Sequence, residues 1–296
     1  MRARNFDRPS PALCGLALAG LLGLAALMPN SAAVAAQMPD GGACTAPEAS
    51  HEERVAGCTA LIASRRTPAR GLTIAYCNRG LALTELGQYD RVIADSAAAI
   101  RIDAKLPCAY LNRGRAWYYK GDLDRAIADY TRTIRLDPTF HEAYANRGAA
   151  YHLRREFARA IPDYDVAISI DPNIAMYHKD RANTLYYMRD YARAIEGLSR
   201  AIELEPGDAE LYFRRADYQS ELGDLDRAIA DLTNAINLSP DDLRFWHARA
   251  TAHELKGNTE QASADHQEAL RREARRFQRL LKNAGIPAER PETSKE

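Results

Sequence analysis

The sequence predicts an all-α protein, a superhelical solenoid of helix-turn-helix repeats with a capping helix at each end. Three observations predict this fold: a pattern that recurs every 34 residues, small residues at the same places in each copy, and a proline near the end of most copies. Six copies follow one another, at residues 73–106, 107–140, 141–174, 175–208, 209–242 and 243–276.

The copies share a recognisable motif. The first contains AYCNRGLALTELGQYDRVIAD, which recurs as AYLNRGRAWYYKGDLDRAIAD in the second and as LYFRRADYQSELGDLDRAIAD in the fifth. This motif resembles the tetratricopeptide repeat family, and its NRG sequence resembles the form common in exported proteins of the bacterial envelope. The resemblance covers roughly two thirds of the chain. It implies paired helices stacked around a concave groove that binds proteins or peptides.

The small residues predict where the two helices of a copy touch. Counting from the first residue of each copy, Gly or Ala fills 16 of the 18 places at positions 8, 20 and 27. Small side chains let helices approach closely, and large aromatic residues at position 4 fill the complementary space. Proline disfavours a helical conformation in the residue that precedes it. The second helix should therefore end just before the proline near the end of the copy, which is Pro138, Pro172, Pro206 or Pro240.

A basic and an acidic residue recur together, 16 residues apart. Position 7 is Arg in all six copies, and position 23 is Asp in five. We interpret them as ion pairs that set the register of the two helices, rather than as an anion-binding site. The fourth copy has Gly197 at position 23, so this repeat is either looser or uses Arg181 for a ligand.

The segments outside the repeats have separate predicted roles. Residues 1–36 have the arginines, apolar run and small residues of an export signal, with cleavage expected after Ala35 or Ala36; the alternative is an uncleaved membrane anchor. Residues 37–72 form an N-terminal segment and a capping helix. Residues 277–296 extend the last helix and end in a flexible tail.

Export favours disulfides among the four cysteines that follow residue 36. We predict a bond between Cys44 and Cys58, which would close a short loop against the first helix. Cys77 and Cys108 either form a second bond or remain two buried thiols. No metal is expected, because the chain has neither a CxxC motif nor a paired-histidine spacing; His253 and His266 are a remote alternative.

The family resemblance places the groove along the side of each first helix that faces away from its partner helix. Tyrosines with amide and basic neighbours on that side suit peptide recognition, although the tyrosine pairs could instead pack against adjacent helices. The predicted groove residues are Asn112, Arg115, Tyr118, Tyr119, Asn146, His152, Lys179, Asn183, Tyr186, Tyr187, Phe213, Arg214 and Arg244.

Part of this set partially resembles the clamp with which some family members bind a C-terminal carboxylate. Lys179 and Asn183 match that pattern, and Arg244 can replace its lysine. Arg214 and Ala248 depart from it, so terminal-carboxylate binding is a minor hypothesis.

Composition and motifs exclude several function classes. The 40 basic and 40 acidic residues are interspersed, so the chain has no basic face for nucleic acid. No nucleophile elbow, phosphate loop or dinucleotide motif is present, so neither catalysis nor a cofactor is expected. Membrane association could involve only the N-terminus or the basic last helix.

The sequence therefore predicts a non-enzymatic interaction scaffold, periplasmic or secreted, with an unidentified protein or peptide partner. The alternative is an assembly factor tethered to the inner membrane by residues 1–36. A metal-binding or catalytic protein is a remote third possibility.

Overall fold

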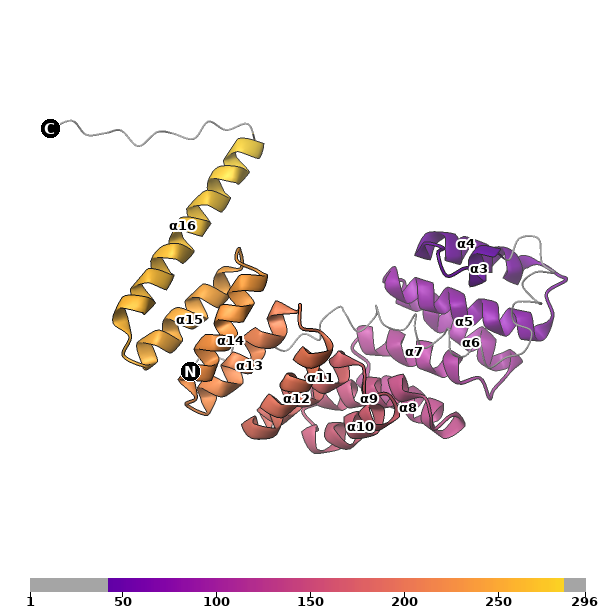
Figure 1. Cartoon of the computed structure of the whole chain (residues 1–296). Helices are drawn as coiled ribbons and strands as arrows, with labels where there is room; N and C mark the ends of the chain where they lie inside the picture. The colour runs from indigo at the N-terminus through magenta and orange to yellow at the C-terminus, as the bar shows by residue number, and fades with distance from the viewer. Residues whose placement is uncertain (1–41, 285–296) are drawn as a thin grey trace. The chain divides into compact units, whose positions relative to one another are not determined.

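The computed structural model describes residues 42–284, and within this range all regular secondary structure is α-helical (Figure 1). The chain divides into two compact units, one ending at Asp180 and the other beginning at Arg181, within helix α11. The predicted export signal and tail lie outside the described residues. The predicted all-α repeat fold is confirmed.

The first unit contains the N-terminal cap and the first three helix pairs. Each pair packs as a hairpin, and each hairpin contacts the next. The helices of this unit are α3 (Gly42–Thr45), α4 (His51–Ala63), α5 (Ala69–Glu85), α6 (Tyr89–Ile102), α7 (Pro107–Tyr119), α8 (Leu123–Leu136), α9 (His141–Leu153) and α10 (Phe157–Ile170).

The second unit contains the later helix pairs. Helix α11 (Ala175–Tyr187) spans the boundary between the units. The helices that follow are α12 (Tyr191–Leu204), α13 (Ala209–Glu221), α14 (Leu225–Leu238), α15 (Leu243–Leu255) and α16 (Thr259–Asn283).

The small residues at positions 8, 20 and 27 are buried in every copy, as predicted. Position 8 shows why a small residue is needed there. In the second copy, a β-carbon at Gly114 would lie 2.7 Å from Cε1 of Tyr130. The hairpin is thus closed by a glycine on the first helix against an aromatic ring on the second.

Four second helices end where the sequence predicts, just before a proline. The residues that follow their last helical residue, Asp137, Asp171, Glu205 and Ser239, have left the helical conformation, and Asp137 and Asp171 are extended. The turn between the two helices requires a left-handed residue at position 15. This residue is glycine in four copies, whereas Arg155 and Arg189 adopt positive φ angles of 60° and 62° in the third and fourth.

Two disulfides join the N-terminal cap and the first repeats. The predicted Cys44–Cys58 bond joins α3 to α4, with Cα atoms 4.6 Å apart. Cys77 and Cys108 are also bonded, which joins α5 to α7 and decides the alternative left open by the sequence. Ser50 begins α4 with a reciprocal capping box to Glu53.

Helix α16 is longer than the helix with which it pairs (Figure 1). Its first half packs against α15 through Ala262, Asp265 and Ala269, which are buried. Residues 273–280 are all exposed. In the described range, no helix is apolar and long enough to span a bilayer.

Candidate partner-binding surface

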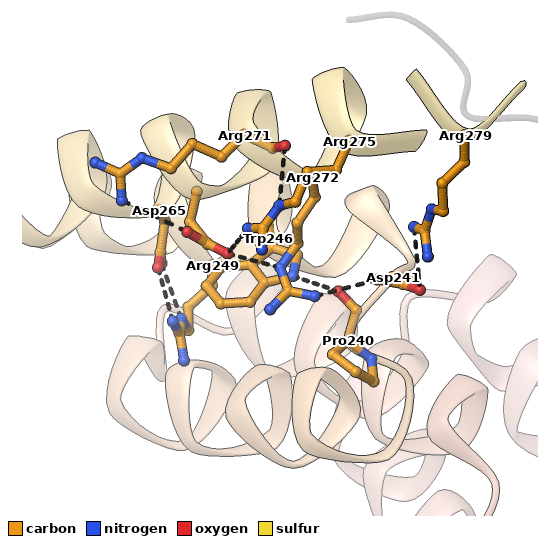
Figure 2. A network of polar contacts seen from close by, with 10 residues as sticks. Pro240, Asp241, Trp246, Arg249, Asp265, Arg271, Arg272, Arg275 and Arg279 are labelled. Carbon is orange, nitrogen blue, oxygen red and sulfur yellow. Dashed lines mark hydrogen bonds and ion pairs between the residues drawn. The ribbon is translucent and has the colours of Figure 1, made fainter. Parts of the chain in front are cut away.

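The recurring arginines form ion pairs inside the hairpins, as predicted. In the third copy, Nε and Nη2 of Arg147 donate to the two carboxylate oxygens of Asp163 at 2.8 and 2.7 Å. The same bidentate geometry joins four other pairs, Arg79–Asp95, Arg113–Asp129, Arg215–Asp231 and Arg249–Asp265, the last of which is drawn in Figure 2. Each carboxylate is buried, and the hydrogen bond to it raises the pKa of Arg79, Arg113, Arg147 and Arg215.

Three of these arginines also connect successive hairpins, a contact that was not predicted from the sequence. Arg147 Nη1 donates to Thr131 Oγ1 of the preceding copy at 3.0 Å, and Arg215 and Arg249 bind Ser199 and Thr233 in the same way. These hydroxyls all stand at position 25, so a Ser or Thr there was the available signal. The arginines therefore have a structural role.

Several predicted groove residues of the first unit are buried in packing. Asn112, Arg115 and Tyr118 are 5%, 7% and 8% exposed. The Asn112 amide donates to the backbone carbonyl of Cys77 at 2.9 Å. These side chains are buried because the first helices of adjacent repeats contact each other, α5 with α7 and α7 with α9.

Other predicted groove residues of this unit remain partly exposed to solvent. Tyr119, Asn146, His152 and Lys179 are partly exposed. Tyr119 stacks on Tyr89, with ring centroids 5.1 Å apart. His152 lies beside Phe157, with ring centroids 5.3 Å apart.

Two polar atoms of this surface are buried without a hydrogen bond to any described residue: Tyr118 Oη and Asn146 Nδ2. Burial also raises the pKa of Tyr118 well above its usual value. A buried polar atom without a partner is costly, so both atoms would gain from a water molecule or a polar group of a ligand.

In the second unit, Tyr186 lies at the centre of a tyrosine cluster. It stacks on Tyr218 with ring centroids 4.4 Å apart and planes 18° from parallel. Tyr187 and Tyr191 contact Tyr186, with ring centroids 5.7 and 5.5 Å from its own. Burial raises the pKa of Tyr186 to about 12.

Asn183 connects this cluster to the next helix. Its side-chain carbonyl accepts a hydrogen bond of 3.2 Å from Tyr218 Oη. Tyr218 is 3% exposed, so it holds Tyr186 in place rather than meeting a ligand. Tyr218, at position 10, was not among the predicted groove residues, because this position lies outside the side of the first helix assigned to the groove.

Arg214 and Arg244 converge on an internal carboxylate. Arg214 Nη2 lies 3.1 Å from one side-chain oxygen of Glu210, and Arg244 Nη2 lies 3.1 Å from the other. Arg244 also covers the rings of Phe213 and Phe245, each centroid 5.4 Å from its Cζ. Phe213 is buried. The two arginines can hold a carboxylate, and in this structure Glu210 contacts both of them, while Arg244 Nη2 also lies 2.7 Å from Asp242 Oδ2.

The two histidines considered as a metal pair make other contacts. His266 Nε2 lies 3.1 Å from Glu254 Oε1, and the centroid of its ring lies 5.8 Å from that of His247. Burial lowers the pKa of His253. No cluster of three or more His, Cys, Asp or Glu residues suited to a metal occurs in residues 42–284.

Family models match most of the repeat region. Residues 114–153 match a model described as a TPR repeat, and residues 74–106, 179–242 and 213–279 match models described as tetratricopeptide repeat. Together these segments cover more than half of the chain. The chain belongs to the tetratricopeptide repeat family. A comparison with curated proteins found no match.

Several solved structures are similar to this one. MamA is 25% identical with a TM-score of 0.53, and the match covers 56% of this chain and 96% of MamA. YrrB, described as a TPR protein with an unusual peptide-binding site, is 20% identical with a TM-score of 0.55 and coverages of 64% and 97%. PilF of Pseudomonas aeruginosa is 14% identical with a TM-score of 0.60 and coverages of 69% and 92%.

Proposed function

We propose that this tetratricopeptide repeat protein is an exported, non-enzymatic scaffold that binds a protein or peptide along its first helices. The observation that carries the proposal is the cluster around Tyr186. Tyr186 and Tyr187 are partly exposed, whereas Tyr218, which stacks on Tyr186, is buried and hydrogen-bonded to Asn183. Rigid tyrosines supported from below lose little entropy when a partner binds, and such residues dominate binding energies.

Two further observations support this function. In the other unit, Tyr119 on α7 is partly exposed, and Tyr118 on α7 and Asn146 on α9 each have a buried polar atom without a hydrogen bond to a described residue. YrrB, which shares the fold, is described as having a peptide-binding site. A polypeptide supplies both apolar side chains and backbone polar groups, and therefore fits this combination.

The contacts of Glu210 argue against terminal-carboxylate recognition as the main mode of binding. Glu210 already bridges Arg214 and Arg244. A peptide carboxylate would have to displace it, and the exchange of one carboxylate for another gives little net gain. We therefore place the main binding energy on the tyrosines.

A tyrosine double variant tests the proposal. Full-length protein would be used to capture partners from an envelope extract by cross-linking, with quantitative mass spectrometry as the readout. Tyr186→Ala combined with Tyr187→Ala should reduce recovery of the principal partner at least about tenfold, as expected for hot-spot residues. The matched control, Ile170→Ala with Leu238→Ala, removes exposed apolar side chains from second helices and should leave capture unchanged. Equal capture by both variants would refute the assignment.

The export part of the proposal rests on residues 1–36 and has its own test. Intact mass and N-terminal sequencing of the protein recovered from the envelope should show a chain that begins after Ala35 or Ala36. A chain that retains residue 1 and partitions with the inner membrane would instead support the tethered assembly factor.

A further inference from the structure

The end of helix α16 exposes apolar side chains that no described part of the chain covers. Leu270, Phe277 and Leu280 are 62%, 61% and 58% exposed. They lie in or next to the segment 273–280, where every residue is exposed. A solvated capping helix does not need three large apolar residues on its surface, so this end of α16 suits a contact with something else.

Charge and apolar character separate around this helix. At 100° per residue, Leu270, Phe277 and Leu280 fall within a sector of about 80°. The five arginines of residues 270–283 fall on the remaining sides. Residues 270–283 contain six basic residues and one acidic residue. This segment is therefore basic and amphipathic, although the whole chain is neutral.

Arg272, Arg275 and Arg279 line a cleft beside Asp241, which lies in the turn between α14 and α15. Figure 2 shows these arginines and Asp241. The cleft has a volume of about 380 Å³. A second cleft of about 340 Å³ adjoins it and shares Asp241, Arg272 and Arg279. The first is also lined by Arg275 and Gln278, and the second by Leu243, Arg276 and Leu280.

The cleft has more cationic than anionic groups. Asp241 is its acidic member, 3.2 Å from Arg272 Nη1 and 3.8 Å from Arg279 Nη2. Arg275 Nη2 contacts Glu268 at 3.0 Å. The two clefts are thus lined by four arginines and one carboxylate, while Glu268, outside the lining, also lies 2.9 Å from Arg272 Nε. Guanidinium groups in such a cluster bind phosphate in preference to neutral ligands.

We propose that the end of α16 binds the surface of an anionic phospholipid bilayer. The arginines of the cleft would contact headgroup phosphates, while Phe277, Leu280 and Leu270 enter the boundary of the acyl chains. Charge complementarity favours an anionic partner. The mixed lining of the second cleft, with Leu243 and Leu280 beside arginines, favours a lipid over a purely acidic peptide. This inference concerns a surface separate from the tyrosine cluster and goes beyond the proposed scaffold function.

Vesicle binding by the full chain tests the proposal. The wild type should sediment with vesicles containing phosphatidylglycerol and not with pure phosphatidylcholine, and about 0.5 M salt should weaken binding through screening. Phe277→Ser with Leu280→Ser, and separately Arg275→Gln with Arg279→Gln, should each weaken binding at least about tenfold.

Matched control variants carry the same changes elsewhere in the second unit. Leu222→Ser with Leu238→Ser alters exposed leucines, and Arg193→Gln with Arg227→Gln alters exposed arginines. Both should bind as the wild type does. All chains share one N-terminus, so equal binding by every variant would assign the binding to residues 1–36 and overturn the proposal. Binding of a polyglutamate peptide without vesicle binding would overturn it in favour of an acidic protein.

Insertion of the end of α16 into the bilayer can also be measured by tryptophan fluorescence. After subtraction of the wild-type spectrum, the tryptophan introduced by Phe277→Trp should shift its emission to shorter wavelength on phosphatidylglycerol vesicles. Brominated acyl chains should quench this emission, because the ring enters the bilayer boundary. Leu238→Trp is the control and should show neither effect. An emission of the Phe277→Trp variant that does not change with vesicles would contradict insertion.

Discussion

Gly114 lies directly against the ring of Tyr130, and a β-carbon at residue 114 would come within 2.7 Å of that ring. The pairing follows a rule through the four central copies. Position 24 is Tyr in the second and third copies, where position 8 is Gly, and it is Leu198 or Leu232 in the fourth and fifth, where position 8 is Ala. Volume is therefore balanced across these four hairpins, as close packing requires.

This balance predicts the effect of enlarging the glycine. Gly114→Ala should lower the free energy of unfolding by about 1–3 kcal/mol, because the new methyl group overlaps a fully buried ring. Tyr130→Leu in the same chain should recover part of the loss by restoring the pairing of the later copies. Urea unfolding of the four chains of this double-mutant cycle measures the coupling, and additive effects would contradict the volume rule.

The bridge between hairpins predicts a stabilising substitution. Arg113 is the most exposed of the paired arginines, with 26% of its side chain accessible, and the preceding copy offers it Ala97 instead of a hydroxyl. Ala97→Thr should raise the free energy of unfolding by about 0.5–1 kcal/mol by supplying the missing hydrogen bond. Ala97→Val adds similar bulk without the acceptor oxygen. If Thr and Val have equal effects in urea unfolding, the bridge contributes nothing to stability.

The left-handed backbone conformation of Arg189 predicts a second stabilising substitution. Arg189 has a φ of 62° at the place where four other copies have glycine, and it is exposed. Because a side chain with a β-carbon is strained in this region, Arg189→Gly should raise the free energy of unfolding by about 1 kcal/mol. Arg189→Ala keeps the strain and is the control for lost charge. Thermal unfolding should rank Gly above both Ala and Arg, and any other order would argue against strain.

Burial of His253 predicts a pH dependence. Desolvation and the nearby cations Arg249 and Lys256 lower the pKa of His253, against the opposing effect of Asp265. A proton then binds the unfolded chain more tightly than the folded one, so stability should fall as the pH drops below about 6.5, the usual value for histidine. His253→Gln should make the melting temperature less sensitive between about pH 7 and 5. An unchanged pH profile in this variant would exclude His253 as a contributor.

Much of the fold could be predicted because the repeat places each residue type in a constant environment. The arginine at position 7 and the aspartate at position 23 recur together, so Arg147 and Asp163 could be paired without coordinates. Pro138 and its counterparts marked the helix ends for a local steric reason. These features depend on short-range rules that apply equally in every copy.

The surface was harder to predict because a helical wheel treats each first helix as if it had one neighbour. In the structure, α7 also contacts α5 and α9, so Asn112 and Tyr118 are buried although they face away from α8. Glu210 was overlooked because its role arises from Arg244, 34 residues later. Such contacts depend on the distance between hairpins, which periodicity alone does not determine.

The order of small and large side chains, the prolines and the charge pairs therefore determined that this chain forms stacked helical hairpins, since each hairpin can bury its apolar face only in that way. Only the tertiary structure decided which tyrosines remain accessible, that Cys77 bonds to Cys108, and that the end of α16 keeps Phe277 and Leu280 exposed. Those outcomes depend on what lies opposite each side chain in space, and that neighbour is often a full repeat away in the sequence.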